Sequence, residues 1–87
     1  MKELKWDSLK SLWLKEHRGA LFEEIIQATV VAIKDHPGRP HQKLMLFDFQ
    51  DYIWLVPYVE NEQEIFLKTA YRSRKYTKRY REGRPLQ

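Results

Sequence analysis

The residues best suited to chemistry lie at the end of the chain, where lysines and arginines alternate with tyrosines. Residues 68–87 contain eight Lys or Arg and one acid, a local charge of +7, whereas residues 1–67 carry a charge of −3. Cations neutralise phosphates, and tyrosine rings stack on unpaired bases. The pattern therefore predicts a nucleic-acid surface. Its residues are Tyr71, Arg72, Arg74, Lys75, Tyr76, Lys78, Arg79 and Tyr80.

The element that must carry this surface is a helix with an unfavourable charge pattern. Ser73 as N-cap and Gly83 after the last turn predict a helix over 74–82. Arg74 and Lys75 would then lie in the first turn, where the helix dipole disfavours cations. Like charges four residues apart cost a further ~0.2–0.5 kcal/mol per pair. Selection for helix stability alone would not produce this charge pattern. An anionic partner would relieve the repulsion.

A simpler interpretation of the same helix is that it is solvated and that its tyrosines pack on the rest of the fold. Tyr76 and Tyr80 are four residues apart and therefore share one helix face, where packing competes with base stacking. Tyr80 can do both, because its ring can pack while its hydroxyl reaches a site.

The three histidines do not form a metal-binding pattern. His36 and His41 lie in a Pro/Gly-rich loop, His17 lies near a helix end, and the chain contains no cysteine. Zinc sites require ligands at short, recognisable spacings, which these residues lack. We expect no metal and no cofactor. An exposed histidine is the simpler interpretation of each, and a histidine general base stays open.

Sequence patterns place two helices before the central loop of the chain. Leu4 and Trp6 indicate a short strand. Asp7 as N-cap and Gly19 as terminator predict a helix over 8–18, and apolar residues at helical spacing predict a second helix over 20–32. The segment 35–40 is rich in Pro and Gly and predicts a loop.

Between the central loop and the basic helix, the sequence predicts strands. We predict strands over 43–49, 52–59 and 65–70, the second at a sheet edge or a bulge because it contains Pro57. The order predicts a single α+β domain over residues 1–87, with two N-terminal helices packed on a small antiparallel sheet and a basic C-terminal helix. No apolar run approaches the ~20 residues of a membrane span, and no signal-peptide pattern opens the chain. The absence of cysteine fits a reducing cytosol, so we expect a cytoplasmic protein.

The order and spacing of four segments resemble the BrnT family of type II toxin–antitoxin ribonucleases. These segments are Trp6-Asp-Ser-Leu-Lys10, Lys15-Glu-His-Arg-Gly19, Phe22-Glu-Glu24 and Arg72-Ser-Arg-Lys-Tyr-Thr-Lys-Arg79. The resemblance covers nearly the whole chain and implies a RelE-like fold. It also implies a toxin that cleaves RNA without a metal and is neutralised by a cognate antitoxin, a DNA-binding protein encoded beside it.

In the chemistry that the resemblance implies, the RNA 2′-hydroxyl attacks its own phosphodiester and cations stabilise the developing charge. Arg74 and Arg72 would stabilise the phosphate, Lys68 would support them, and Tyr80 would supply a hydroxyl or a stacking ring. Lys10 and His17 are further candidates. The RNA-binding set is Lys10, Lys75, Lys78, Arg79 and Tyr76.

Two positions depart from the BrnT pattern and keep other functions open. Tyr80 stands where the family has a glutamate, and Tyr76 stands where it has a small alanine. A non-catalytic RNA- or DNA-binding module, such as a decayed toxin, is the first alternative, and an interaction domain for an acidic protein is the second. The partners expected are RNA and the antitoxin, with no membrane, and self-association into a homo-oligomer stays open.

Overall fold

The computed structural model describes residues 2–86 and places six strands and three short helices in that range. The elements in chain order are β1 (Glu3–Lys5), α1 (Ser8–Arg18), α2 (Phe22–Ile25), β2 (Thr29–Asp35), β3 (Lys43–Phe49), β4 (Tyr52–Glu60), β5 (Glu64–Leu67), β6 (Tyr71–Ser73) and α3 (Arg74–Arg81). No helix among these residues has the length and apolar character needed to cross a membrane.

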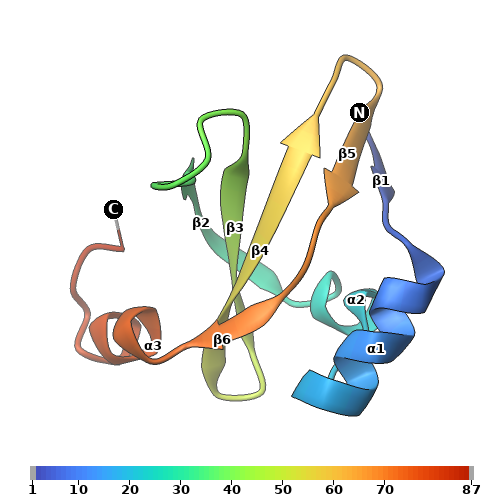
Figure 1. Ribbon diagram of the computed structural model, residues 1–87. Coiled ribbons are helices and arrows are strands. Elements are labelled where there is room, and N and C mark those ends of the chain that lie inside the picture. The colour runs from blue at the N-terminus through green and yellow to red at the C-terminus, as the bar shows by residue number, and fades with distance from the viewer. Residues whose placement is uncertain (1, 87) are drawn as a thin grey trace.

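All the strands belong to one mixed sheet in the order β1-β5-β4-β3-β2, with β6 paired to β4 beyond the end of β5. Neighbouring strands are antiparallel except β1 and β5, which are parallel. The β3–β4 hairpin turns at Gln50 and Asp51, both of which have positive φ, as a tight two-residue turn requires. In Figure 1, α1 and α2 lie to one side of the strands and α3 lies to the other.

The architecture predicted above, a RelE-like fold with two N-terminal helices packed on a small antiparallel sheet, is wrong. The helix predicted over 20–32 is a single turn, α2, and Thr29–Asp35 instead forms the edge strand β2. The β-branched residues Val30, Val31 and Ile33 favour a strand once β3 is available as a partner. The sheet is also mixed and six-stranded, because β1 joins it parallel to β5 and β6 adds a further pairing.

The prediction that Pro57 marks an edge strand or a bulge is also wrong. β4 is central, with β3 on one side and β5 and β6 on the other. The carbonyl of Pro57 accepts a hydrogen bond from the Lys68 backbone N–H at 2.8 Å, so the Pro57 nitrogen faces the same side. That side is the gap between Leu67, where β5 ends, and Tyr71, where β6 begins, so the missing N–H of Pro57 lies just beyond the β4–β5 ladder and does not interrupt it.

Side chains alternate between the two faces of β4 and create two hydrophobic clusters. Trp54, Val56 and Tyr58 pack under α1 and α2, against Leu14 and Phe22 among others. Ile53 and Leu55 of β4 face α3, where the second cluster lies. Its buried residues are Leu44, Leu46, Ile53 and Leu55, with Tyr71, Tyr76 and Leu86 packed against them.

The hydroxyls of Thr77 and Ser73 fix α3 to this sheet. Thr77 of α3 is buried, and its Oγ1 accepts a hydrogen bond from the Ile53 N–H at 2.8 Å and donates to the Ser73 carbonyl at 2.6 Å. Ser73 is also the N-cap of α3, since its Oγ accepts from the Tyr76 N–H at 3.1 Å. The orientation of the basic helix is therefore set by bonds to β4 and β6.

Candidate nucleic-acid interface

Most of the lysines and arginines are not engaged in ion pairs. Within residues 2–86 the ion pairs involve Lys2, Lys5, Lys15, Lys43 and Arg84. Several of the other cations instead lie over aromatic rings. A guanidinium or ammonium on a ring face keeps its N–H groups available for an anion, so these residues are the candidate interface.

One group of such cations surrounds Trp13, whose ring is 38% exposed on α1. Lys10 Nζ lies 4.1 Å from the ring centroid, and the Arg18 guanidinium lies 4.9 Å from it. The His17 ring stacks on Trp13 with centroids 4.5 Å apart. Lys10 and His17 share a helix face with Trp13, because they lie three and four positions from it. Arg18 lies five positions away, and its long side chain reaches the same ring.

A second group surrounds Tyr52 at the start of β4, whose side chain is 40% exposed. The Arg72 guanidinium lies 5.4 Å from the Tyr52 ring centroid and 4.8 Å from that of Trp54. Arg81 of α3 lies 5.9 Å from the Tyr52 ring and donates a hydrogen bond to the Asp51 carbonyl. Tyr52 also lines a hollow of about 580 Å³ whose other walls are Arg74, Thr77, Lys78, Arg81 and Glu82.

The two groups meet where α1 ends. Gly19 terminates α1 with φ +89°, and a Cβ at this position would lie 3.3 Å from Arg72 Nη2. The two groups together form what we call the cation–aromatic strip, from α1 across β6 and the start of β4 to α3. Its residues are Lys10, Trp13, His17, Arg18, Tyr52, Arg72, Arg74, Lys78 and Arg81.

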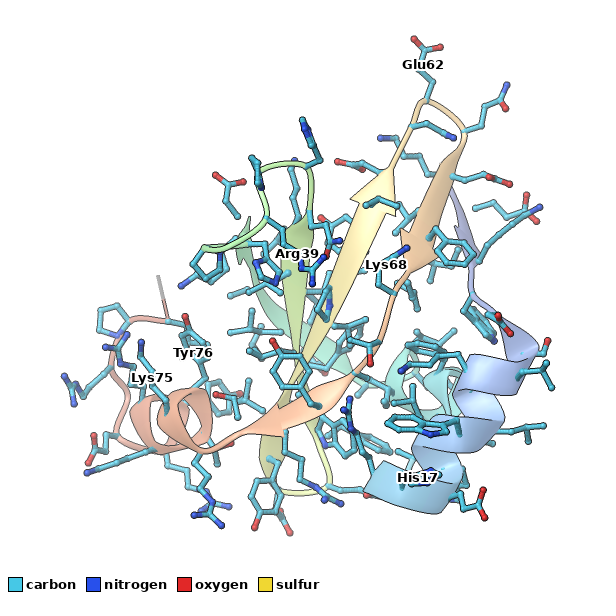
Figure 2. The ribbon with its side chains drawn as sticks, viewed as in Figure 1. His17, Arg39, Glu62, Lys68, Lys75 and Tyr76 are labelled. Atoms are coloured by element: carbon cyan, nitrogen blue, oxygen red, sulfur yellow. The ribbon has the colours of Figure 1, made fainter. Side chains whose placement is uncertain are left out.

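The hydrogen bond of His17 fixes its neutral tautomer. Nδ1 lies 2.9 Å from the Trp13 carbonyl, which can only accept, so Nδ1 carries the proton and donates. The other ring nitrogen, Nε2, is then an acceptor with a free lone pair. His17 is exposed at the last turn of α1 (Figure 2), so this lone pair is available to a ligand on the strip.

The four residues predicted to be catalytic lie in three different places. Arg72 and Arg74 belong to the strip. Beside the strip, Tyr80 lies in a small hollow of about 200 Å³ whose walls include Tyr52 and Arg81 of the strip as well as Asp48 and Asp51. The two carboxylates disfavour a phosphate at the Tyr80 hydroxyl. Lys68 lies at the start of the β5–β6 connection, on the sheet face that carries α3, whereas Arg72 points to the face that carries α1.

The residues predicted to bind RNA are similarly divided. Lys10 and Lys78 belong to the strip. Tyr76 packs on the second hydrophobic cluster, and its hydroxyl accepts a hydrogen bond from Lys34 Nζ at 2.6 Å. Lys75 and Arg79 lie 5.5 and 5.9 Å from the Tyr76 ring, away from Tyr52. Figure 2 shows Lys75 and Tyr76 at the opposite end of the molecule from His17.

Sequence reasoning missed the residues that only the tertiary structure joins to the basic helix. Trp13, Arg18 and Tyr52 are not among the site residues predicted from the sequence. The pairing of β6 with β4, Trp54 opposite Arg72, brings the three elements together. The detectable signal was the spacing Lys10-x-x-Trp13 followed by His17 and Arg18, which gathers cations and a second ring around one indole.

No family model, curated protein sequence or solved structure matches the chain. Among the described residues there is also no group of three or more His, Cys, Asp or Glu side chains positioned to hold a metal ion. The functional interpretation therefore depends on the strip itself.

Proposed function

We propose that the protein binds single-stranded RNA along the cation–aromatic strip and cleaves it without a metal, as the endoribonuclease toxin of a toxin–antitoxin pair. One observation carries the proposal: the strip alternates exposed rings with cations that have no ion-pair partner among residues 2–86. The resemblance to the BrnT family supports the assignment as a toxin.

The spacing of charges and rings favours a single strand over a duplex. Unpaired bases can stack on exposed rings, each stacked base contributing about 1–3 kcal/mol, while neighbouring cations hold the phosphates. Trp13 and Tyr52 supply the rings, and Arg18 and Arg72 supply cations beside them. A duplex would present its phosphates and keep its bases stacked, so the rings would have no partner.

His17 gives the strip a base for RNA cleavage. Its Nε2 would take the proton of the 2′-hydroxyl, whose oxygen attacks the adjacent phosphorus. The bond from phosphorus to the 5′ oxygen then breaks, and water protonates that oxygen. The products are a 2′,3′-cyclic phosphate and a 5′-hydroxyl end. The guanidiniums of Arg18 and Arg72 would stabilise the negative charge of the phosphorane, the largest contribution expected at such a site.

An antitoxin would act by covering the same surface. An acidic segment laid along the strip would pair with cations that RNA otherwise occupies, so inhibition and RNA binding would be mutually exclusive. Charge complementarity of this kind favours rapid association.

The test is cleavage of an unstructured RNA by the purified protein in excess EDTA. We expect cyclic-phosphate products from the wild type and none from His17→Gln, with RNA affinity retained in the variant. Induced expression should arrest growth for the wild type only. Cleavage by His17→Gln at the wild-type rate would refute the role of His17, and no cleavage by the wild type would refute the nuclease assignment.

A second candidate, a non-catalytic RNA-binding module, is favoured by the separation of the residues first predicted to be catalytic. Lys68 and Tyr80 lie outside the strip, and Lys68 is on the other face of the sheet from Arg72. Salt-sensitive RNA binding by the wild type without any cleavage would support this candidate. Failure to bind RNA at all would leave an acidic protein as the partner.

A further inference from the structure

A second cationic hollow lies on the α3-bearing face of the sheet, outside the strip. It encloses about 310 Å³, and its walls include His36 and Arg39 from the β2–β3 loop, Lys68 and Thr69 after β5, and Tyr71 of β6. Figure 2 shows Arg39 and Lys68 extending toward the same region in front of the central strands. Residues from three parts of the chain therefore meet in one concave place.

The charge of this hollow is positive and is not neutralised nearby. Neither Arg39 nor Lys68 takes part in an ion pair within residues 2–86, and no carboxylate from that range lines the hollow. Asp35, next to His36 in the chain, pairs across the ladder with Lys43 and so points to the opposite face. Two fixed cations with no acid between them favour an anion.

The loop geometry gives His36 the role of a donor. The Gly38 N–H donates to His36 Nδ1 at 3.0 Å, so Nδ1 is unprotonated and the proton of the neutral ring is on Nε2. The loop is closed by hydrogen bonds from the Gln42 N–H to the Arg39 carbonyl and from the His36 N–H to the Gln42 carbonyl. His36 is thus the opposite tautomer to His17. While the Gly38 N–H occupies Nδ1, the Nε2–H of His36 can donate to an oxyanion, and neither ring nitrogen is free to accept a proton.

The hollow begins one side chain away from the strip. Arg18 of the strip donates from Nη1 to Thr69 Oγ1 at 3.1 Å and to the Ala70 carbonyl at 2.8 Å. Thr69 itself lines the hollow. An RNA strand bound beside Arg18 would therefore need to cross only the β5–β6 connection to reach Lys68 and Arg39 in the hollow.

We propose that the hollow holds a backbone phosphate of the RNA strand whose bases stack on the strip, an inference that rests on the RNA binding proposed above. Lys68 and Arg39 neutralise the phosphate, and His36 donates its Nε2–H to a phosphate oxygen. The hollow thereby fixes the direction in which the strand leaves the strip. Lys68 is a phosphate-positioning residue in this arrangement rather than a member of the cleavage centre.

The experiment is fluorescence anisotropy of a labelled, unstructured RNA with the full chain and with Lys68→Ala and Arg39→Ala. A hydrogen bond to a charged group is strong enough that we expect about tenfold weaker binding for each variant. The dependence of log affinity on log salt should become shallower by about 0.7 per lost phosphate contact. Both residues are exposed, so circular dichroism should show an unchanged fold.

Lys43→Ala is the matched control, because Lys43 lies on the other face of the sheet and pairs with Glu60 at 3.3 Å. The control should bind RNA within about twofold of the wild type. If Lys68→Ala and Arg39→Ala bind as tightly as Lys43→Ala while Arg72→Ala binds weakly, the hollow has no part in RNA binding and this inference is wrong, though the proposed function stands. Absence of RNA binding by the wild type would overturn both.

Discussion

Replacement of Thr77 by valine tests how the basic helix is fixed to the sheet. Valine has the shape of threonine but cannot form the two hydrogen bonds of the buried hydroxyl, to the Ile53 N–H and the Ser73 carbonyl. The Ile53 N–H then stays buried without a partner, which costs about 1–3 kcal/mol. We expect a loss of about 2 kcal/mol in the free energy of unfolding. For a domain of this size that corresponds to a fall in Tm of roughly 8–16 °C.

Urea denaturation followed by circular dichroism measures this loss directly. Thr29→Val is the control, because Thr29 is exposed at the start of the edge strand β2 and should change stability by less than about 0.5 kcal/mol. The Thr77 variant should also bind RNA less tightly, because α3 carries Arg74, Lys78 and Arg81. Equal stability of the two variants would show that these hydrogen bonds do not hold α3, and the reasoning would fail.

Three further predictions concern the strip and α2. Arg74→Ala should abolish toxicity and leave Tm nearly unchanged, as measured by growth assays and thermal melts, because Arg74 is exposed among like charges; full toxicity would exclude it from the site. Trp13→Ala should weaken RNA binding about 10–100-fold in anisotropy titrations through lost stacking, whereas unchanged affinity would assign Trp13 to structure alone. The pKa of Glu24 is lowered by the Leu21 N–H and by Lys15; its stabilising effect is therefore present above the unfolded pKa of about 4.3 and lost as pH falls through the lower folded value. In urea titrations, the free energy of unfolding of Glu24→Gln should fall less on acidification than that of the wild type. Identical pH profiles for the two proteins would contradict this.

Local signals were sufficient where a helix has both its caps in the sequence. α1 begins after Asp7, whose carboxylate accepts from the Leu9 and Lys10 N–H groups, and it ends at Gly19, as predicted. α3 follows the same rule with Ser73 as its N-cap. Side-chain caps act over three residues, so they can be detected without knowledge of the fold.

Tertiary pairing decided the segments that were predicted wrongly. Thr29–Asp35 has apolar residues that fit a helical spacing, yet β3 offers it a ladder of hydrogen bonds. Pro57 suits a central strand only because β5 and β6 leave a gap opposite it. Neither fact has a local signature, since each depends on pairing with a different segment of the chain.

The candidate site was predicted in part for the same reason. The charge of residues 68–87 follows from composition, and the roles of Arg72 and Arg74 stay predictions. That Arg72 lies between the rings of Tyr52 and Trp54, beside Gly19, follows from the β4–β6 register and could not be derived from spacing. The separation of Lys68 from Arg72 also depends on the fold. An even spacing of four would put both on one face of a regular strand, but the chain between them leaves the sheet between β5 and β6, and they face opposite sides.

The measurement that tests the central claim most directly is the salt dependence of binding of wild-type protein to a labelled single-stranded RNA. If the strip holds phosphates, log affinity should fall linearly with log salt and drop steeply between ~50 and ~200 mM. Arg72→Ala should bind more weakly and with a shallower slope. No saturable binding at ~50 mM salt, or an affinity indifferent to salt and to Arg72, would contradict the account.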